Sequence, residues 1–281
     1  MKHRFTLLGI AGALLLSATA CKSEKEQKTD NPALREVSIA EEEVPAESLN
    51  PPFRTRKIQI SLGKDIYKLE VDYPQSGRAN VVESIRRDLY SRFSIKNADL
   101  EKPDAAFQKK ANDFMNEYRQ AQAEAASDDF EMPAWSYEGE VEVEYNTQQY
   151  ITYEWEDYIY MGGAHGMPQH FSFSFDAQTG KPLKWEDFFV QGCWAKLKPI
   201  VKQGLIAQSG YEEVDPSTWP LVQPTLAPAF TPKGIAFYYE AYEIACFAAG
   251  IPSCVIPYSR LQPYMTDYAK SIAAAQAGKG K

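Results

Sequence analysis

Apolar and polar residues begin to alternate at Lys57, and this alternation predicts a β-hairpin. A period of two places one set of side chains on a single buried face of a sheet. The turn between the two strands lies at Gly63-Lys64-Asp65. The apolar positions of the hairpin are Ile58, Ile60, Leu62, Tyr67, Leu69 and Val71.

Two amphipathic helices are predicted next. The first has apolar residues at helical spacing, which gives one apolar stripe, and Asn80 is placed to cap its N-terminus. Pro103 suits the first turn of a second helix, which extends over residues 104–126. The apolar stripes are Val82, Ile85, Leu89 and Phe93 in the first helix and Phe107, Phe114 and Tyr118 in the second.

Three strands follow in succession, over residues 135–145, 150–160 and 171–175. Strands joined in this order predict an antiparallel meander. The middle strand is the most informative, because its two faces differ in chemistry. One face carries Tyr150, Thr152, Glu154, Glu156, Tyr158 and Tyr160, and the other carries Ile151, Tyr153, Trp155, Asp157 and Ile159.

The C-terminal part mixes helices with short strands. A helix is predicted over residues 194–209, but Pro199 would remove one of its hydrogen bonds, so we expect it to begin near Lys198. The proline-rich segment 211–233 predicts loop and edge strand. The remaining predicted elements are two short strands and a closing helix disturbed by Pro263, over residues 235–239, 254–256 and 259–275.

This order of elements predicts an α+β fold, with helices packed on an antiparallel sheet. The 17 tyrosines and 14 phenylalanines agree with a sheet-rich fold. We divide the folded part into a smaller N-terminal α+β part, residues 53–130, and a C-terminal α+β core domain, residues 131–281.

The N-terminus has the pattern of a bacterial lipoprotein signal peptide. Lys2 and Arg4 form a positive start, and the apolar stretch 5–16 is shorter than the about 20 residues that span a bilayer. Small residues then lead to Cys21. We expect residues 1–20 to be removed and Cys21 to carry a lipid that anchors the protein to a membrane. The alternative is an ordinary signal peptide, with Cys21 incidental.

Residues 21–52 are predicted to form a lipidated, flexible tether, because they are polar, acidic and poor in aromatic residues. The expected location is the cell envelope, facing the periplasm or the exterior. Lys22 is not the aspartate that retains lipoproteins at the inner membrane. This favours the outer membrane in a host with two membranes.

The net charge argues against one class of partner. The formal charge is −8, and loss of residues 1–20 would take away Lys2 and Arg4 and leave −10. Nucleic-acid binding needs clustered lysine and arginine to displace phosphate counterions, so no nucleic acid is expected as a partner. An acidic protein favours the approach of basic proteins.

The three cysteines after Cys21 leave two interpretations open. Cys246 and Cys254 are close in sequence and could form a disulfide across a turn, which export would permit. Cys193 would then be left over. The alternative is three buried free thiols. The spacing does not fit a zinc site.

The candidate chemistry lies in the connection between two of the predicted strands. Its glycines leave the backbone open to positive φ angles or to a ligand that lies against the main chain. A histidine can donate or accept a hydrogen bond there, and the tyrosines can stack on a sugar ring or a partner surface. The candidate ligand-binding residues are Tyr158, Tyr160, Gly162, Gly163, Ala164, His165 and Gly166. The alternative is a structural loop in which His165 is satisfied internally.

Other chemistry is weakly signalled. His165 and His170 could form half of a metal site that Glu154, Glu156 or Asp157 would complete. Glu154 and Glu156 lie about 7 Å apart on one strand face, a separation that a glycosidase can use. Catalytic sequence motifs and an evident nucleophile are lacking. We therefore predict no enzyme activity, no metal and no cofactor. An envelope hydrolase using His165 is kept as an alternative.

Two blocks of sequence carry a resemblance. The first contains Tyr160 to Gly166, Phe173 to Asp176, Thr179 to Leu183 and Trp185 to Phe189, and the second Thr231 to Tyr239, Tyr242 to Ala245 and Val255 to Tyr258. Together they resemble an extracytoplasmic bacterial domain family. That family occurs in the lysozyme-binding ectodomain of the anti-sigma factor RsiV, beside the catalytic domain of the peptidoglycan deacetylase PdaC, and in many lipoproteins of unknown function.

The resemblance covers residues 57–270 and implies a non-enzymatic envelope domain on an α+β scaffold. It does not imply one ligand, and the deacetylase domain is absent from this chain. We expect a binding module for a wall-associated ligand, either a muramidase-like (lysozyme-like) protein or a peptidoglycan fragment. The alternative is a structural or assembly lipoprotein that docks on a protein partner.

Overall fold

The computed structural model describes residues 51–279, except residues 65, 128–130, 213–216 and 218. The predicted signal peptide, Cys21 and nearly all of the predicted tether lie outside the described residues. Among the residues that are described, no helix combines the length and the apolar character needed to cross a membrane. The strands are β1 (Arg54–Leu62), β2 (Tyr67–Ser76), β3 (Ser136–Asn146), β4 (Tyr150–Tyr160), β5 (Met167–Asp176), β6 (Ala229–Thr231), β7 (Gly234–Tyr238) and β8 (Ser253–Ile256). The α-helices are α1 (Ala79–Arg92), α2 (Pro103–Ser127), α3 (Trp185–Phe188), α4 (Trp194–Ser209), α5 (Tyr258–Leu261) and α6 (Asp267–Lys279).

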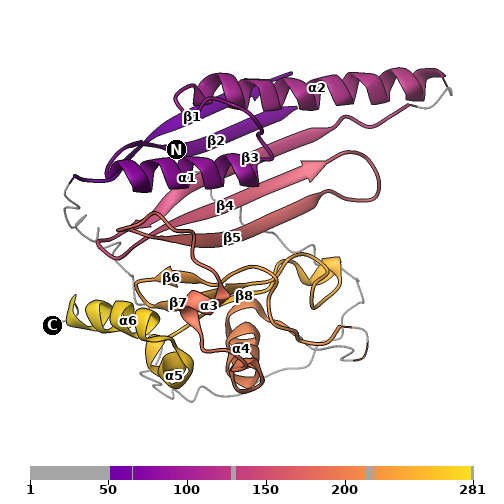
Figure 1. The fold of residues 1–281 in the computed structure, drawn as a ribbon. Helices are drawn as coiled ribbons and strands as arrows, with labels where there is room; N and C mark the ends of the chain where they lie inside the picture. The colour runs from indigo at the N-terminus through magenta and orange to yellow at the C-terminus, as the bar shows by residue number, and fades with distance from the viewer. Residues whose placement is uncertain (1–50, 65, 128–130, 213–216, 218, 280–281) are drawn as a thin grey trace, which may run out of the picture. The chain divides into compact units, whose positions relative to one another are not determined.

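The strands form two sheets, and the predicted α+β class is confirmed. The first sheet has the order β1-β2-β3-β4-β5, and the second has the order β6-β7-β8. The predicted meander appears as β3, β4 and β5, which pair antiparallel in sequence order. In Figure 1 the helices α1 and α2 lie on one side of the first sheet, while α4, α5 and α6 lie around the second.

One pairing differs from the predicted antiparallel sheet. β2 and β3 run parallel, with Tyr67 opposite Tyr137 and Val71 opposite Val141. The reason is the connection between them, which contains both α1 and α2. A crossover that carries helices returns the chain to the same end of the sheet, so the next strand runs in the same direction. The first sheet therefore spans the predicted boundary at residues 130/131.

Two main apolar cores support the two sheets. The first lies between the first sheet and helices α1 and α2, and its fully buried members include Ile58, Val71, Phe107 and Tyr153. The second lies between the second sheet and α4 and α6, and it includes Leu197, Phe237 and Ile272. The alternation read from the sequence thus separates two faces of β4 that pack on different cores, with Tyr153 in the first core and Tyr150 in the second.

Three helix predictions are corrected by the structure. α1 begins at Ala79 with Arg78 as its N-cap, and the Asn80 side chain instead donates to the carbonyl oxygens of Gln178 and Thr179. α4 begins at Trp194, so Pro199 lies inside the helix rather than near its first residue. The closing helix is divided into α5 and α6 by a 3-10 turn that contains Pro263.

Cys193, Cys246 and Cys254 are free thiols. Cys193 and Cys254 are buried, whereas Cys246 is exposed. The Cys254 sulfur lies in the interface between β8 and α4, since a Cβ added to Gly204 of α4 would be 3.0 Å from this sulfur. The alternative of a Cys246–Cys254 disulfide is therefore not realised in this structure, and the alternative of three buried thiols holds for two of them.

Candidate binding surface

Two tyrosines at the end of β4, Tyr158 and Tyr160, form hydrogen bonds with the loop between β4 and β5. Gly162 and Gly163 have φ angles of +94° and +95°, which favour glycine. The Tyr160 hydroxyl donates to the Gly163 carbonyl at 3.1 Å, and the Gly166 N–H donates to the Tyr158 hydroxyl at 3.1 Å. A Cβ on Gly166 would lie 2.3 Å from the Tyr158 ring, so only glycine lets that ring lie across the loop.

His165 is held on three sides. Its ring stacks on Phe247, with centroids 3.7 Å apart and an interplanar angle of 15°. Nδ1 lies 2.9 Å from the Gly166 carbonyl oxygen and Nε2 lies 3.1 Å from the Tyr242 hydroxyl. A neutral imidazole satisfies both contacts when Nδ1 donates and Nε2 accepts. Both nitrogens are thus engaged, which disfavours His165 as a general base.

The aromatic residues around His165 form a continuous group, which we call the aromatic surface: His165, Trp219, Tyr242 and Phe247. The Tyr242 ring lies 6.0 Å from Phe247 and 6.4 Å from Trp219 between centroids. Tyr242 is 41% exposed, and His165 is exposed as well. Aromatic rings that are half open to solvent supply a large contact area with a polar edge, as binding surfaces require.

Tyr242 is held in a strained conformation. Its φ is +69°, a region that a bulky residue seldom occupies. The following residue fixes the turn, because the Glu243 carboxylate accepts from the Glu240 N–H at 2.9 Å and from the Thr225 N–H at 2.7 Å. Ile244 then buries the segment in the second core. Strain of this kind costs about 1–3 kcal/mol and is common at functional sites.

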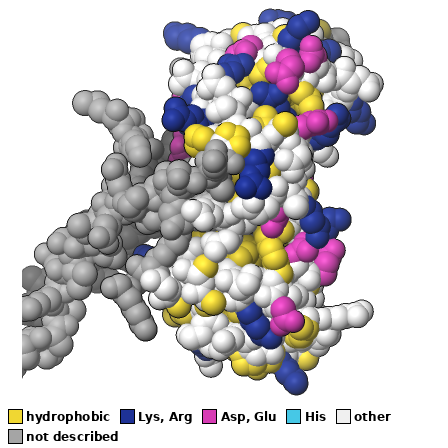
Figure 2. Space-filling model, turned by 60° about the vertical axis from the view of Figure 1, so that its left-hand side comes forward, with side chains coloured by type: hydrophobic (Ala, Val, Ile, Leu, Met, Phe, Trp, Pro, Cys, Tyr) yellow, Lys and Arg dark blue, Asp and Glu magenta, His cyan; other side chains and the backbone are white. Residues whose placement is uncertain are grey.

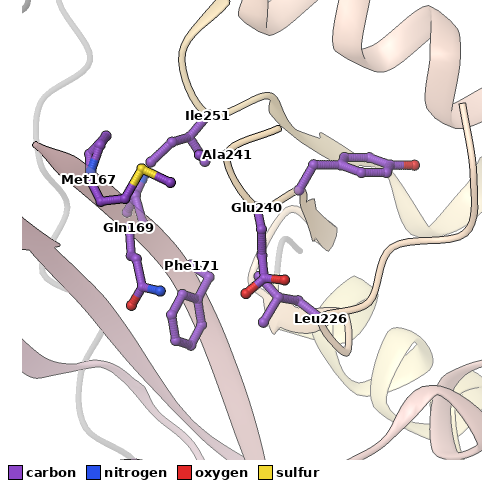
Figure 3. A pocket seen from close by; sticks show the side chains of 10 residues that line it. Met167, Gln169, Phe171, Leu226, Glu240, Ala241 and Ile251 are labelled. Carbon is purple, nitrogen blue, oxygen red and sulfur yellow. The ribbon is translucent and has the colours of Figure 1, made fainter. Parts of the chain in front are cut away.

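A cleft lies beside the aromatic surface. It has a volume of about 210 Å³, and β5 forms one wall with Met167, Gln169 and Phe171. Figure 3 shows these side chains directed toward the opposite wall, where Glu240 and Leu226 lie. Ala241 and Ile251 complete that wall. The cleft is smaller than the about 300–1,000 Å³ of small-molecule pockets.

The residues weighed for a metal site are dispersed. His165 contacts Tyr242, whereas His170 forms an ion pair with Glu154 at 2.8 Å. Asp157 lies on the opposite face of β4 and accepts from the Trp155 indole at 3.0 Å. Burial raises the pKa of the Asp157 carboxyl, although that hydrogen bond opposes the shift. No group of three or more metal-binding side chains occurs within the ranges that the structure describes.

Charge is unevenly distributed. Figure 2 shows a face on which acidic and basic side chains are interspersed. A denser set lies on the solvent face of β1, β2 and β3, where the Lys57 ammonium is surrounded by carboxylates at 3.4–3.8 Å. Desolvation of the ammonium lowers its pKa, but the carboxylates outweigh it and raise the pKa overall. These carboxylates belong to Glu70, Asp72, Glu140 and Glu142.

Sequence reasoning found one of the four residues of the aromatic surface. It singled out His165, but not Trp219, Tyr242 or Phe247, which lie more than 50 residues further along the chain. The available signal was the Tyr-Glu-Ile-Ala segment at 242–245, which entered the resemblance without a role. Conversely, Tyr158 and Tyr160 use their hydroxyls inside the loop. Whether the predicted loop residues bind a ligand stays a prediction.

Comparisons with known proteins give two family matches. Residues 60–168 match the family described as Deacetylase PdaC, and residues 186–259 match the one described as a protein of unknown function, DUF3298. The first match ends within β5, at the cleft, and the second runs from α3 to α5. Curated proteins gave no match.

Two solved structures share the fold. A member of the DUF3298 family from Bacteroides fragilis is 20% identical, with a TM-score of 0.63 over 77% of this chain and 94% of that chain. A DUF3298 family protein from Pseudomonas aeruginosa is 22% identical, with a TM-score of 0.55 over 79% of this chain and 98% of that chain. At this identity the likeness is one of architecture.

Proposed function

We propose that this chain, whose predicted resemblance to the domain family shared with PdaC is confirmed by the matches at residues 60–168 and 186–259, is a non-enzymatic binding module of the cell envelope. The two families suggest a non-catalytic domain. The ligand proposed is wall-associated, either a lysozyme-like protein or a peptidoglycan fragment. The binding site proposed is the aromatic surface.

One observation carries the choice of site. Tyr242 keeps a half-exposed ring in a left-handed conformation, although the turn would be relaxed by glycine. Packing does not account for this, because 41% of the residue remains accessible to solvent. Backbone strain at Tyr242 that leaves its ring exposed to solvent is best explained by a binding partner that contacts this ring.

Charge supports a basic protein as one ligand. The chain has a formal charge of −8, and the carboxylates around Lys57 add a local concentration of negative charge. Such a field speeds the approach of a basic partner and weakens with added salt. A peptidoglycan fragment would depend instead on stacking against Tyr242 and Phe247.

The envelope location rests on the N-terminal pattern. We propose that Cys21 carries the lipid and that the chain beyond it reaches from the membrane to the wall. Replacement Cys21→Ser should move the protein from the membrane fraction to the soluble exported fraction. Retention of the variant in the membrane fraction would contradict the anchor.

Calorimetric titration tests the binding site. The soluble fragment is residues 45–281, which contain every residue that the structure describes. It is titrated with lysozyme and with purified muropeptides. Tyr242→Gly removes the ring while keeping the positive φ, and His165→Ala removes the stacking partner of Phe247. We expect each to weaken binding at least tenfold, which is about 1.4 kcal/mol.

The control is Ile206→Ala on α4, where another large apolar side chain is 52% exposed. It should leave the affinity unchanged. Binding that neither Tyr242→Gly nor His165→Ala affects would move the site away from the aromatic surface. Absence of heat with both ligands, from a fragment with native circular dichroism, would exclude them and favour a protein partner in the envelope.

A further inference from the structure

β5 is an edge strand, and half of its outer edge is covered. The first sheet ends with β5, which pairs only with β4 in that sheet. Near its C-terminal end, the Ser174 carbonyl accepts from the Leu183 N–H at 2.8 Å and the Asp176 N–H donates to the Lys181 carbonyl at 3.0 Å. The even-numbered residues of β5 therefore direct their backbone groups outward.

The other half of this edge is open. Because outward and inward groups alternate in an antiparallel strand, the N–H and C=O of His170 and the C=O of Pro168 face outward. Pro168 has no N–H to leave unpaired, as expected for an edge position. Within the described part of the chain, no backbone or side-chain partner meets the outward groups of His170.

The cleft follows this open edge. Its β5 wall consists of the five residues 167–171, a length of about 16 Å at about 3.3 Å per residue. Across from them lie Leu226, Glu240 and Ala241, as Figure 3 shows. A narrow cleft of about 210 Å³ along backbone donors and acceptors suits an extended peptide better than a compact small molecule.

His170 also lines the cleft, but its partner Glu154 balances its charge, so the unbalanced charge at the cleft is negative. Glu240 is exposed and forms no ion pair with any residue that the structure describes. Glu156, on the neighbouring strand and opposite His170 in register, is exposed too. Apolar side chains from Met167, Phe171 and Leu226 surround this charge. A peptide that alternates apolar residues with one lysine or arginine would match the lining.

We propose that the open edge of β5 over Met167–Phe171 accepts an extended segment of a partner protein as an added strand, with a basic side chain of that segment paired with Glu240. This goes beyond the proposed function, because the binding groups are the β5 backbone and Glu240 and not the aromatic surface. Strand addition gives affinity through main-chain hydrogen bonds and specificity through alternate side chains.

The test uses full-length protein and fluorescent pentapeptides in an anisotropy titration. The first peptide is Thr-Val-Lys-Val-Thr, the second has glutamate in place of lysine, and the third is the lysine peptide with methylated backbone amides. We expect saturable binding of the lysine peptide, binding at least tenfold weaker for the glutamate peptide, and none for the methylated one, because methylation removes the donors that a strand needs.

Variants locate the binding. Ala241→Trp should abolish binding by filling the cleft, and Glu240→Lys should reverse the preference between the lysine and glutamate peptides. Glu117→Lys makes the same charge change on the exposed side of α2 and should leave both affinities unchanged. Circular dichroism confirms that each variant is folded.

Three results would overturn the proposal. They are the absence of saturable binding by folded wild-type protein, equal binding of the methylated peptide, and unchanged binding by Ala241→Trp. A fourth concerns the occupant. If the protein alone forms a concentration-dependent dimer in sedimentation and Ala241→Trp prevents this dimer, a second copy of this chain covers the β5 edge. The proposed segment of a partner protein would then be wrong.

Discussion

The imidazole of His170 lies 2.8 Å from the Glu154 carboxylate, on the face of the first sheet that meets the second sheet. The hydrogen bond to Glu154 raises the pKa of His170 above the ordinary 6.5, although partial burial acts in the opposite direction. Glu156 and Glu144 add to the increase. The His170 imidazolium and the Glu154 carboxylate are therefore both charged under mildly acidic conditions.

His170→Gln should reduce stability in a pH-dependent way. A histidine whose pKa is raised on folding contributes stability that is complete below the unfolded pKa, about 6.5, and is lost as the pH rises through the folded pKa. The difference in unfolding free energy between wild type and variant should be greatest near pH 5.5 and smaller at pH 9. Both side chains are more than a third accessible, 37% and 34%, so we expect at most about 1 kcal/mol.

Urea unfolding at the two pH values measures this difference. Glu154→Gln is the matched control, because it keeps the shape of the partner and removes its charge, and it should abolish most of the pH dependence. A difference between wild type and His170→Gln that stays constant or grows with pH would show that the ion pair does not raise the pKa of His170.

At the scale of elements, the sequence predicted most strands and helices because their apolar periods are long. α2, β3 and β4 have ten or more residues, and each was predicted within two residues of its ends. The parallel β2–β3 pairing was missed although both crossover helices were predicted, because alternation within a strand carries no information about strand direction. The aromatic surface escaped for a similar reason, since Phe247 and His165 meet only through the fold.

The close approach of β7 and β8 is another feature that no local pattern predicts. A Cβ on Gly234 would lie 2.1 Å from the Ile256 carbonyl oxygen and 2.9 Å from the Pro257 Cα. Both are backbone atoms that cannot rotate away. At Gly204 in α4 the nearest atom is instead the end of the Ile256 side chain, at 2.4 Å.

Gly234→Ala should therefore lower the free energy of unfolding by about 2–3 kcal/mol, because β7 and β8 must separate. Gly204→Ala should cost less than half of that, since a side-chain end can move and alanine gains about 0.8–1.0 kcal/mol of helix propensity. Urea unfolding compares the two. Equal losses of unfolding free energy in the two variants would mean that the β8 backbone moves as easily as a side chain. The contact between Gly234 and the Ile256 backbone would then not be rigid.

For the molecule as a whole, two buried hydroxyls connect the sheets. The Thr152 hydroxyl on β4 donates to the Phe230 carbonyl on β6 at 2.9 Å, and the Phe230 N–H donates to the Ser174 hydroxyl on β5 at 2.9 Å. Thr152 and Ser174 also bond to each other at 2.7 Å. All protons are accommodated if Ser174 donates to Thr152. Polar residues on this face of β4 and β5 thus bind the edge of the second sheet.

Thr152→Val should lower the free energy of unfolding by about 1–3 kcal/mol, because it keeps the shape but leaves the buried Phe230 carbonyl without a donor. Ser174→Ala should cost a similar amount by leaving the Phe230 N–H unpaired. Each replacement also removes the hydrogen bond between Thr152 and Ser174. The double variant should therefore lose less unfolding free energy than the sum of the two single variants, with a coupling of about 0.5–3 kcal/mol. A double-mutant cycle in urea measures the coupling.

Ser271→Ala is the control, because it removes an exposed hydroxyl that donates to the Tyr268 carbonyl at 2.7 Å, and it should change stability by less than about 0.5 kcal/mol. Additive losses would show that the two hydroxyls act separately and that apolar packing alone holds the sheets together.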